Sequence, residues 1–204
     1  MKKLYLATLI IAVLGFVALP SIADANLLGN PDFETAGIGG DQDADIWVES
    51  DDARREGWPD FAERPTGSWG IGVMDWGGNK NGEAYQDVTS GITGSTPYNF
   101  TIWAKRDGGE VVGDYYMTLA WYQDGIYIAD NSQNISLTDS WVKHTLTGTS
   151  PGNANKVQVL FGQDADQCGK WDDASLDAVP EPASMLLLGS GLLGLFGIGR
   201  KKRS

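Results

Sequence analysis

The chain of 204 residues is long enough for one domain with additional terminal segments, and its 42% hydrophobic and 21% charged residues indicate a globular protein. Residues 26–180 carry nine basic and 25 acidic residues, and this net charge of −16 disfavours nucleic acid as a partner. The only cysteine, Cys168, excludes an internal disulfide and a CxxC motif, and the only histidine, His144, excludes His-rich metal sites.

The first 25 residues have the pattern of a secretory signal peptide. Lys2 and Lys3 precede an apolar run over residues 4–19, and Ala23-Asp24-Ala25 matches an A-x-A cleavage site. The pattern predicts export and cleavage before Asn26. A retained membrane anchor is the alternative.

The body of the chain, residues 26–178, lacks the 3.6-residue apolar period of helices. Short alternating runs are separated by Gly, Asn, Asp, Ser and Pro, which is typical of β-strands and turns. Residues 50–68 are expected to form a long loop. Ten short strands at this spacing predict an antiparallel β-sandwich. The strands are expected near residues 27–34, 45–49, 69–75, 83–88, 97–105, 114–123, 126–129, 136–147, 156–163 and 170–177.

Aromatic side chains on the outer sides of these strands form a candidate sugar platform. Sugars present apolar C–H faces and hydroxyl groups, so a binding surface needs flat rings beside hydrogen-bonding side chains. Alternation places Trp103, Tyr116 and Tyr122 on the non-core sides of neighbouring segments, where Gln158 and Lys105 can add hydrogen bonds. Trp47 and Trp76 are expected near loops at the rim. The alternative is that these rings are ordinary semi-buried aromatics.

Five segments of the body carry a family resemblance when they are taken in order. They are Asn26-Leu27-Leu28-Gly29-Asn30-Pro31-Asp32-Phe33-Glu34, Ala84-Tyr85-Gln86-Asp87-Val88, residues 97–105, Trp141, and Trp171-Asp172-Asp173-Ala174-Ser175-Leu176. This order resembles carbohydrate-binding modules of the family 4, 9 and 22 type. The resemblance implies an all-β fold over 26–178, an antiparallel jelly-roll β-sandwich of the galactose-binding-like type. It says less about the ligand, because this fold carries many functions.

The same resemblance implies a structural calcium ion beside the first and last strands. The matching positions are Glu34 and either Asp172 or Asp173, with backbone carbonyls near Asn30 completing the six to eight oxygens that calcium needs. Asp172 is the favoured ligand, because alternation with Ala174 and Leu176 should point it inward. The alternative is a hydrogen-bonded or protonated Asp and a solvated Glu34.

The C-terminal segment, residues 179–204, has three parts. Val179-Pro180-Glu181-Pro182 is followed by an uncharged stretch over 183–199, which as a helix would span about 25 Å, and by a basic tail over 200–204. This order resembles the PEP-CTERM sorting signal. The resemblance implies a transmembrane helix over 183–199, processing by an exosortase-type enzyme and a Gram-negative envelope protein of exopolysaccharide or biofilm systems. A plain C-terminal anchor is the alternative.

Together these features predict an exported, non-catalytic protein that binds polysaccharide. No GxSxG, HExxH or P-loop motif is present in the sequence. The main alternative is a structural or adhesive surface protein that binds protein partners or itself, and a glycoside-active enzyme is the third hypothesis.

Overall fold

The computed structural model describes residues 26–50, 52–57, 67–74, 82–106, 114–163 and 168–179. The signal peptide, Trp76, residues 180–182 of the sorting motif, the helix expected over 183–199 and the basic tail lie outside these residues. Within the described part of the chain, no helix is both long and apolar enough to cross a membrane.

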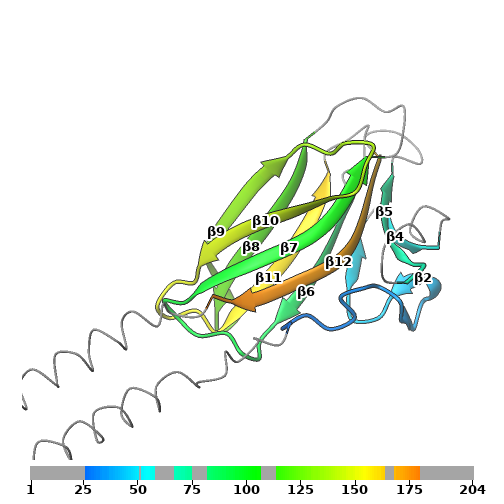
Figure 1. The fold of residues 1–204 in the computed structure, drawn as a ribbon. Helices are drawn as coiled ribbons and strands as arrows, with labels where there is room; N and C mark the ends of the chain where they lie inside the picture. The colour runs from blue at the N-terminus through cyan, green and yellow to red at the C-terminus, as the bar shows by residue number, and fades with distance from the viewer. Residues whose placement is uncertain are drawn as a thin grey trace, which may run out of the picture.

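The described residues form a sandwich of two antiparallel five-stranded sheets, with a short two-stranded sheet at one end (Figure 1). One large sheet has the order β10-β7-β12-β5-β4 and the other β3-β6-β11-β8-β9. This architecture confirms the prediction of an all-β jelly-roll sandwich. The strands are β1 (Ala36–Gly37), β2 (Gly40–Ala44), β3 (Val48–Ser50), β4 (Ala53–Glu56), β5 (Gly70–Met74), β6 (Gly82–Val88), β7 (Pro97–Arg106), β8 (Tyr115–Gln123), β9 (Ile126–Ile135), β10 (Val142–Thr149), β11 (Lys156–Gln163) and β12 (Cys168–Ala178).

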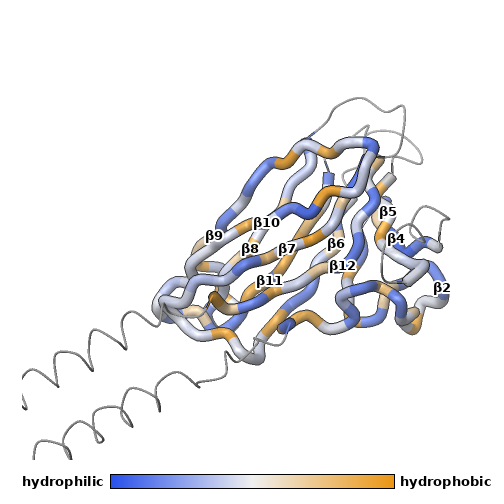
Figure 2. Tube along the Cα trace, viewed as in Figure 1, coloured by the Kyte–Doolittle hydropathy of each residue, from blue (hydrophilic) through white to orange (hydrophobic). Residues whose placement is uncertain are grey.

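The core lies between the two large sheets and follows the expected alternation. Figure 2 shows hydrophobic and hydrophilic positions alternating along the strands. Phe161 on β11 lies at its aromatic centre, with ring centroids 5.0 Å from Trp171, 5.6 Å from Trp47 and 6.1 Å from Phe33. Burial of such rings removes large apolar areas from water and stabilises the sandwich. The buried inward residues of the central strands are Tyr98, Phe100, Ile102, Ala104, Tyr115, Met117, Leu119, Trp121, Val157, Val159 and Phe161.

The segment 27–34 is not a strand, so that prediction is wrong. Leu27 donates its backbone N–H to the carbonyl of Leu176 at 2.9 Å, as a strand would. Asn30 and Phe33 then adopt φ values of 42° and 55°, which are incompatible with extended backbone. The segment therefore follows β12 irregularly, with a second backbone bond from the Ala174 N–H to the Pro31 carbonyl at 2.8 Å, and does not form a ladder with it.

Other boundaries also differ from the sequence prediction, since the strand expected over 45–49 begins only at Val48. The expected long loop over 50–68 contains β4, because the segment 53–56 pairs with β5. The strand expected over 136–147 begins only at Val142, while β9 continues to Ile135.

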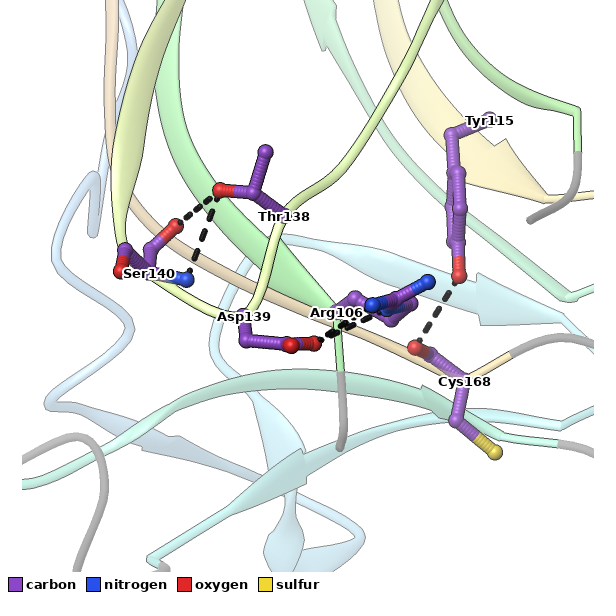
Figure 3. Close-up of polar contacts among 6 residues, drawn as sticks. All are labelled: Arg106, Tyr115, Thr138, Asp139, Ser140 and Cys168. Carbon is purple, nitrogen blue, oxygen red and sulfur yellow. Dashed lines mark hydrogen bonds and ion pairs between the residues drawn. The ribbon is translucent and has the colours of Figure 1, made fainter. Parts of the chain in front are cut away.

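One end of the sandwich is closed by polar contacts between the β9–β10 loop and the end of β7 (Figure 3). Arg106 donates its backbone N–H to Thr138 at 2.8 Å, and its Nε and Nη2 donate to Asp139 at 3.0 and 2.8 Å. Nearby, the Tyr115 hydroxyl donates to the carbonyl of Cys168 at 3.2 Å, which ties the start of β8 to the start of β12. Cys168 is half-buried there.

Candidate functional site

The outer aromatic residues are divided between opposite faces of the sandwich. Trp103 lies on β7, in the β10-β7-β12-β5-β4 sheet. Tyr116 and Tyr122 lie on β8 in the other sheet, and Gln158 lies on the adjacent strand β11. The expectation of one shared platform is therefore wrong. β7 and β8 are consecutive in sequence, but the chain crosses from one sheet to the other between them.

Trp47 lies in the core, so its expected place at a rim is also wrong. Its side chain is 4% exposed, and Nε1 donates to the carbonyl of Asn30 at 3.0 Å. The ring packs 5.0 Å from Phe33, centroid to centroid. Little of this ring remains for a sugar to stack on.

A pair of tyrosines marks one end of the outer face of the β8 sheet. The rings of Tyr122 and Tyr127 stand edge to face, with centroids 5.9 Å apart and an interplanar angle of 78°. Lys156 Nζ lies 4.1 Å from the centroid of Tyr122 and 2.9 Å from Asp87 Oδ2. Gln158 Nε2 donates to Asp87 Oδ1 at 3.1 Å. These bonds hold the lysine, the amide and the carboxylate beside the rings.

The polar network continues on β9 on the other side of the tyrosines. Asp130 accepts hydrogen bonds from the Tyr127 hydroxyl and from Ser132 Oγ, the latter at 2.6 Å. Ser132 Oγ lies 3.0 Å from Thr118 Oγ1 on β8. The bond from Ser132, followed by that from Tyr127, lowers the pKa of Asp130, and Asp130 raises the pKa of Tyr127. The carboxylate is therefore ionised and the phenol neutral at neutral pH.

The register places Asp87, Gln158, Ala120 and Asp130 in one row across β6, β11, β8 and β9. Neighbouring strands are about 4.8 Å apart, so the row spans roughly 14 Å between its outer Cα atoms. Ala120 presents only a methyl group between longer polar side chains. We call the surface made by this row and by Tyr122, Tyr127 and Lys156 the Tyr122 face.

Tyr116 lies on the same outer side of β8 as Tyr122 but far from the Tyr122 face. The two tyrosines are six positions apart along the strand, which corresponds to about 20 Å. The Tyr116 hydroxyl lies 3.3 Å from Glu83 Oε2.

The opposite outer face combines Trp103 with buried charges that sequence reasoning missed. Trp103 is paired in register with Lys143 on β10 and with Asp172 on β12. Lys105 is paired with Lys170, and both are buried. The alternation of residues along the strand predicted that Lys105 points outward. It could not predict that an outward-pointing lysine is buried by its neighbours.

The residues proposed as calcium ligands are largely engaged in other bonds. Asn30 Nδ2 donates to the carbonyls of Thr35 and Asp45 at 2.9 and 3.2 Å, and Asn30 Oδ1 accepts from the Thr35 N–H at 3.0 Å. Glu34 Oε1 accepts the backbone N–H groups of Ser68 and Trp69 at 2.6 and 2.8 Å. Asn30 therefore stabilises its own loop, and Glu34 joins that loop to the segment that precedes β5.

Asp172 and Asp173 lie at a bulge in β12. Asp173 has a φ of 50°, and the register with β7 shifts between Asp172 and Ser175. Asp172 therefore lies on the outer side of the sheet, as Trp103 does. The expectation that it points inward, on the same side as Ala174 and Leu176, is wrong. Asp172 is nonetheless 0% exposed, and its Oδ1 accepts the N–H of Asp173 at 2.7 Å. In the described part of the chain, no three carboxylate, histidine or cysteine side chains form a group suited to a metal ion.

Comparison with known families identifies the C-terminal segment. Residues 178–203 match the PEP-CTERM protein-sorting motif. The chain therefore carries this sorting motif, as the sequence predicted. No curated protein matches the chain.

Comparison with solved structures identifies the fold of the body. The CBM22-1 xylan-binding domain from Paenibacillus barcinonensis Xyn10C aligns with a TM-score of 0.56 at 17% identity, over 78% of this chain and 97% of that one. TmCBM61, solved in complex with β-1,4-galactotriose, aligns with a TM-score of 0.53 at 15% identity, over 76% of this chain and 99% of that one. The body has the fold of carbohydrate-binding modules.

The same sandwich also occurs within a larger phage protein. The enzymatically active domain of bacteriophage CBA120 tailspike protein 4 aligns with a TM-score of 0.58 at 12% identity, over 76% of this chain. This chain spans only 21% of that structure. The match shows a shared fold and carries no information on catalysis here.

Proposed function

We propose that this chain is an exported, non-catalytic protein that binds polysaccharide on the Tyr122 face. The observation that carries the proposal is the Tyr122–Tyr127 pair beside side chains already oriented by mutual hydrogen bonds. Aromatic rings with adjacent, pre-positioned polar groups suit a ligand that has apolar faces and many hydroxyls. The fold shared with carbohydrate-binding modules supports the same conclusion.

The charge of the Tyr122 face indicates which sugars it accepts. Asp87 and Asp130 are both exposed, and the single cation, Lys156, is paired with Asp87. Ionised carboxylates accept hydrogen bonds from hydroxyl and ammonium groups and repel other anions. We therefore expect neutral or amino-sugar polymers to bind better than uronate-rich polymers.

The two carboxylates of the Tyr122 face lie far apart in the sheet and are already engaged in hydrogen bonds, which suits a binding surface. Asp87 and Asp130 are three strands apart, roughly 14 Å between Cα atoms. Asp87 also bonds to Lys156 and Gln158, and Asp130 to Tyr127 and Ser132.

The sorting motif provides the setting for this activity. It implies that an exosortase-type enzyme processes the tail, after a stage in which the C-terminal helix holds the protein at the membrane. The proposed destination is the envelope, outer surface or extracellular matrix of a Gram-negative bacterium. The proposed polysaccharide is one of the exopolysaccharides of that envelope or of a biofilm matrix.

Affinity electrophoresis through gels containing neutral, amino-sugar or uronate polysaccharides tests the proposal on the full chain in mild detergent. We expect retardation by a neutral or amino-sugar polymer. Tyr122→Ala and Tyr127→Ala should each weaken it at least tenfold, about 1.4 kcal/mol of binding free energy. Tyr122→Phe, which keeps the ring, should retain most of the binding.

Trp103→Ala is the matched control, because it removes an aromatic ring from the opposite face. It should leave retardation unchanged, and the melting temperature of each variant shows whether it is folded. Loss of binding in Trp103→Ala alone would contradict the proposed location. If no polysaccharide retards the wild-type chain while sedimentation shows self-association, the adhesive alternative replaces the proposal.

A further inference from the structure

Arg55 on β4 is a cation buried against the loop that precedes β1 and against β2. Its side chain is 3% exposed. Nε donates to the carbonyl of Phe33 at 2.5 Å, Nη2 to that of Glu34 at 2.7 Å and Nη1 to that of Asp41 at 2.8 Å. The guanidinium carbon lies 3.8 Å from the centroid of Trp69. One side chain therefore links three backbone carbonyls and stacks on a ring.

Two of these carbonyls, those of Phe33 and Glu34, belong to the opening motif to which the family resemblance assigns a calcium ion. A calcium ion needs six to eight oxygens at about 2.3–2.6 Å. The carbonyls of Phe33 and Glu34 already accept from Arg55, and Glu34 Oε1 already accepts two backbone N–H groups. These three oxygens of the opening motif are therefore already engaged by donors of the chain itself, an arrangement that does not need a calcium ion.

The surrounding charges suit a monovalent organic cation. Burial, the largest effect, lowers the pKa of Arg55, whereas Glu34, Asp41 and Glu49 each favour its charged form. A guanidinium remains protonated under such conditions. Its planar set of donors matches several carbonyls at once, which the point charge of a lysine cannot do.

We propose that Arg55 is a built-in cation that takes the structural role of the expected calcium ion, so that the fold of this protein is independent of calcium. The guanidinium joins Phe33, Glu34 and Asp41 to β4 and, through β4, to the sheet of β5 and β12. The ends of the domain are joined separately by direct bonds, since Asn26 Nδ2 donates to the carbonyl of Ala174 at 2.9 Å and Asn26 Oδ1 accepts the N–H of Leu176 at 3.0 Å.

Thermal unfolding of the full chain in detergent tests this proposal, in millimolar calcium and in excess chelator. Magnesium at the same concentration controls for screening of the acidic surface. We expect the same melting temperature in all three buffers. Arg55→Lys and Arg55→Gln should lower it by roughly 10 °C.

Arg54→Gln is the matched control, because Arg54 directly precedes Arg55 in β4 and is also an arginine. Arg54 is half-buried and forms an ion pair with Glu56. It should shift the melting temperature much less than Arg55→Gln does. A wild-type melting temperature that rises in calcium but not in magnesium, with saturable calcium binding by calorimetry, would overturn the proposal. The proposal would also be overturned if Arg55→Lys had the melting temperature of the wild type. Both of these results can be obtained even if Arg55→Gln does not fold.

Discussion

Glu49 is a carboxyl group whose ionisation opposes folding. Burial raises its pKa from 4.5 to about 7, although the N–H of Ala44 donates to it at 3.1 Å, and Asp43 raises the pKa further. The unfolded chain therefore releases this proton at lower pH than the folded protein does. The contribution of Glu49 to stability is present below about pH 4.5 and is lost as the pH rises through about 7.

Glu49→Gln tests this linkage, because it keeps the shape of the side chain without the titration. We expect the wild-type melting temperature to decline relative to that of Glu49→Gln as the pH rises from 4.5 to 7. Thermal unfolding of both proteins across this pH range measures the difference. Parallel curves would show that burial does not perturb Glu49.

The turn between β8 and β9 positions the tyrosine pair of the Tyr122 face. Asp124 and Gly125 have φ values of 51° and 82°, a conformation that glycine and asparagine adopt at little cost. Space around Gly125 is open, so any cost of a side chain there is conformational. Gly125→Ala should lower the free energy of unfolding by about 1 kcal/mol and weaken polysaccharide binding, whereas Gly125→Asn should do less. Denaturant titration and affinity electrophoresis measure both, and equal effects of Ala and Asn would contradict the account.

Strands with strong apolar alternation could be predicted from sequence to within about one residue, as 97–105 and 156–163 show. Their inward residues pack against one another, so the local pattern contains the necessary information. The prediction of a strand over 27–34 was wrong because the positive φ values at Asn30 and Phe33 interrupt the extended backbone. β4 was missed because its inward residues are Ala53 and Arg55, and the partners of Arg55 are carbonyls that no sequence pattern reveals.

The assignment of strands to sheets determines which residues share a surface. The sequence indicated that Trp103 and Tyr122 point outward, but it did not indicate that β7 and β8 belong to different sheets. That partition depends on contacts between residues far apart in the chain. Tyr127 and Asp130 were not singled out for the same reason, since only the pairing of β9 with β8 brings them beside Tyr122.

The central claim is that a polysaccharide binds across the Tyr122 face. Fluorine NMR of the full chain labelled with fluorotyrosine, titrated with oligosaccharides of a polymer that retards it, tests this claim most directly. Assignment by Tyr→Phe variants separates exposed Tyr127 and half-buried Tyr122 from buried Tyr98 and Tyr115. The account predicts saturable shifts of Tyr122 and Tyr127 with Tyr98 and Tyr115 unchanged. Binding that leaves the Tyr122 and Tyr127 signals unmoved would contradict it.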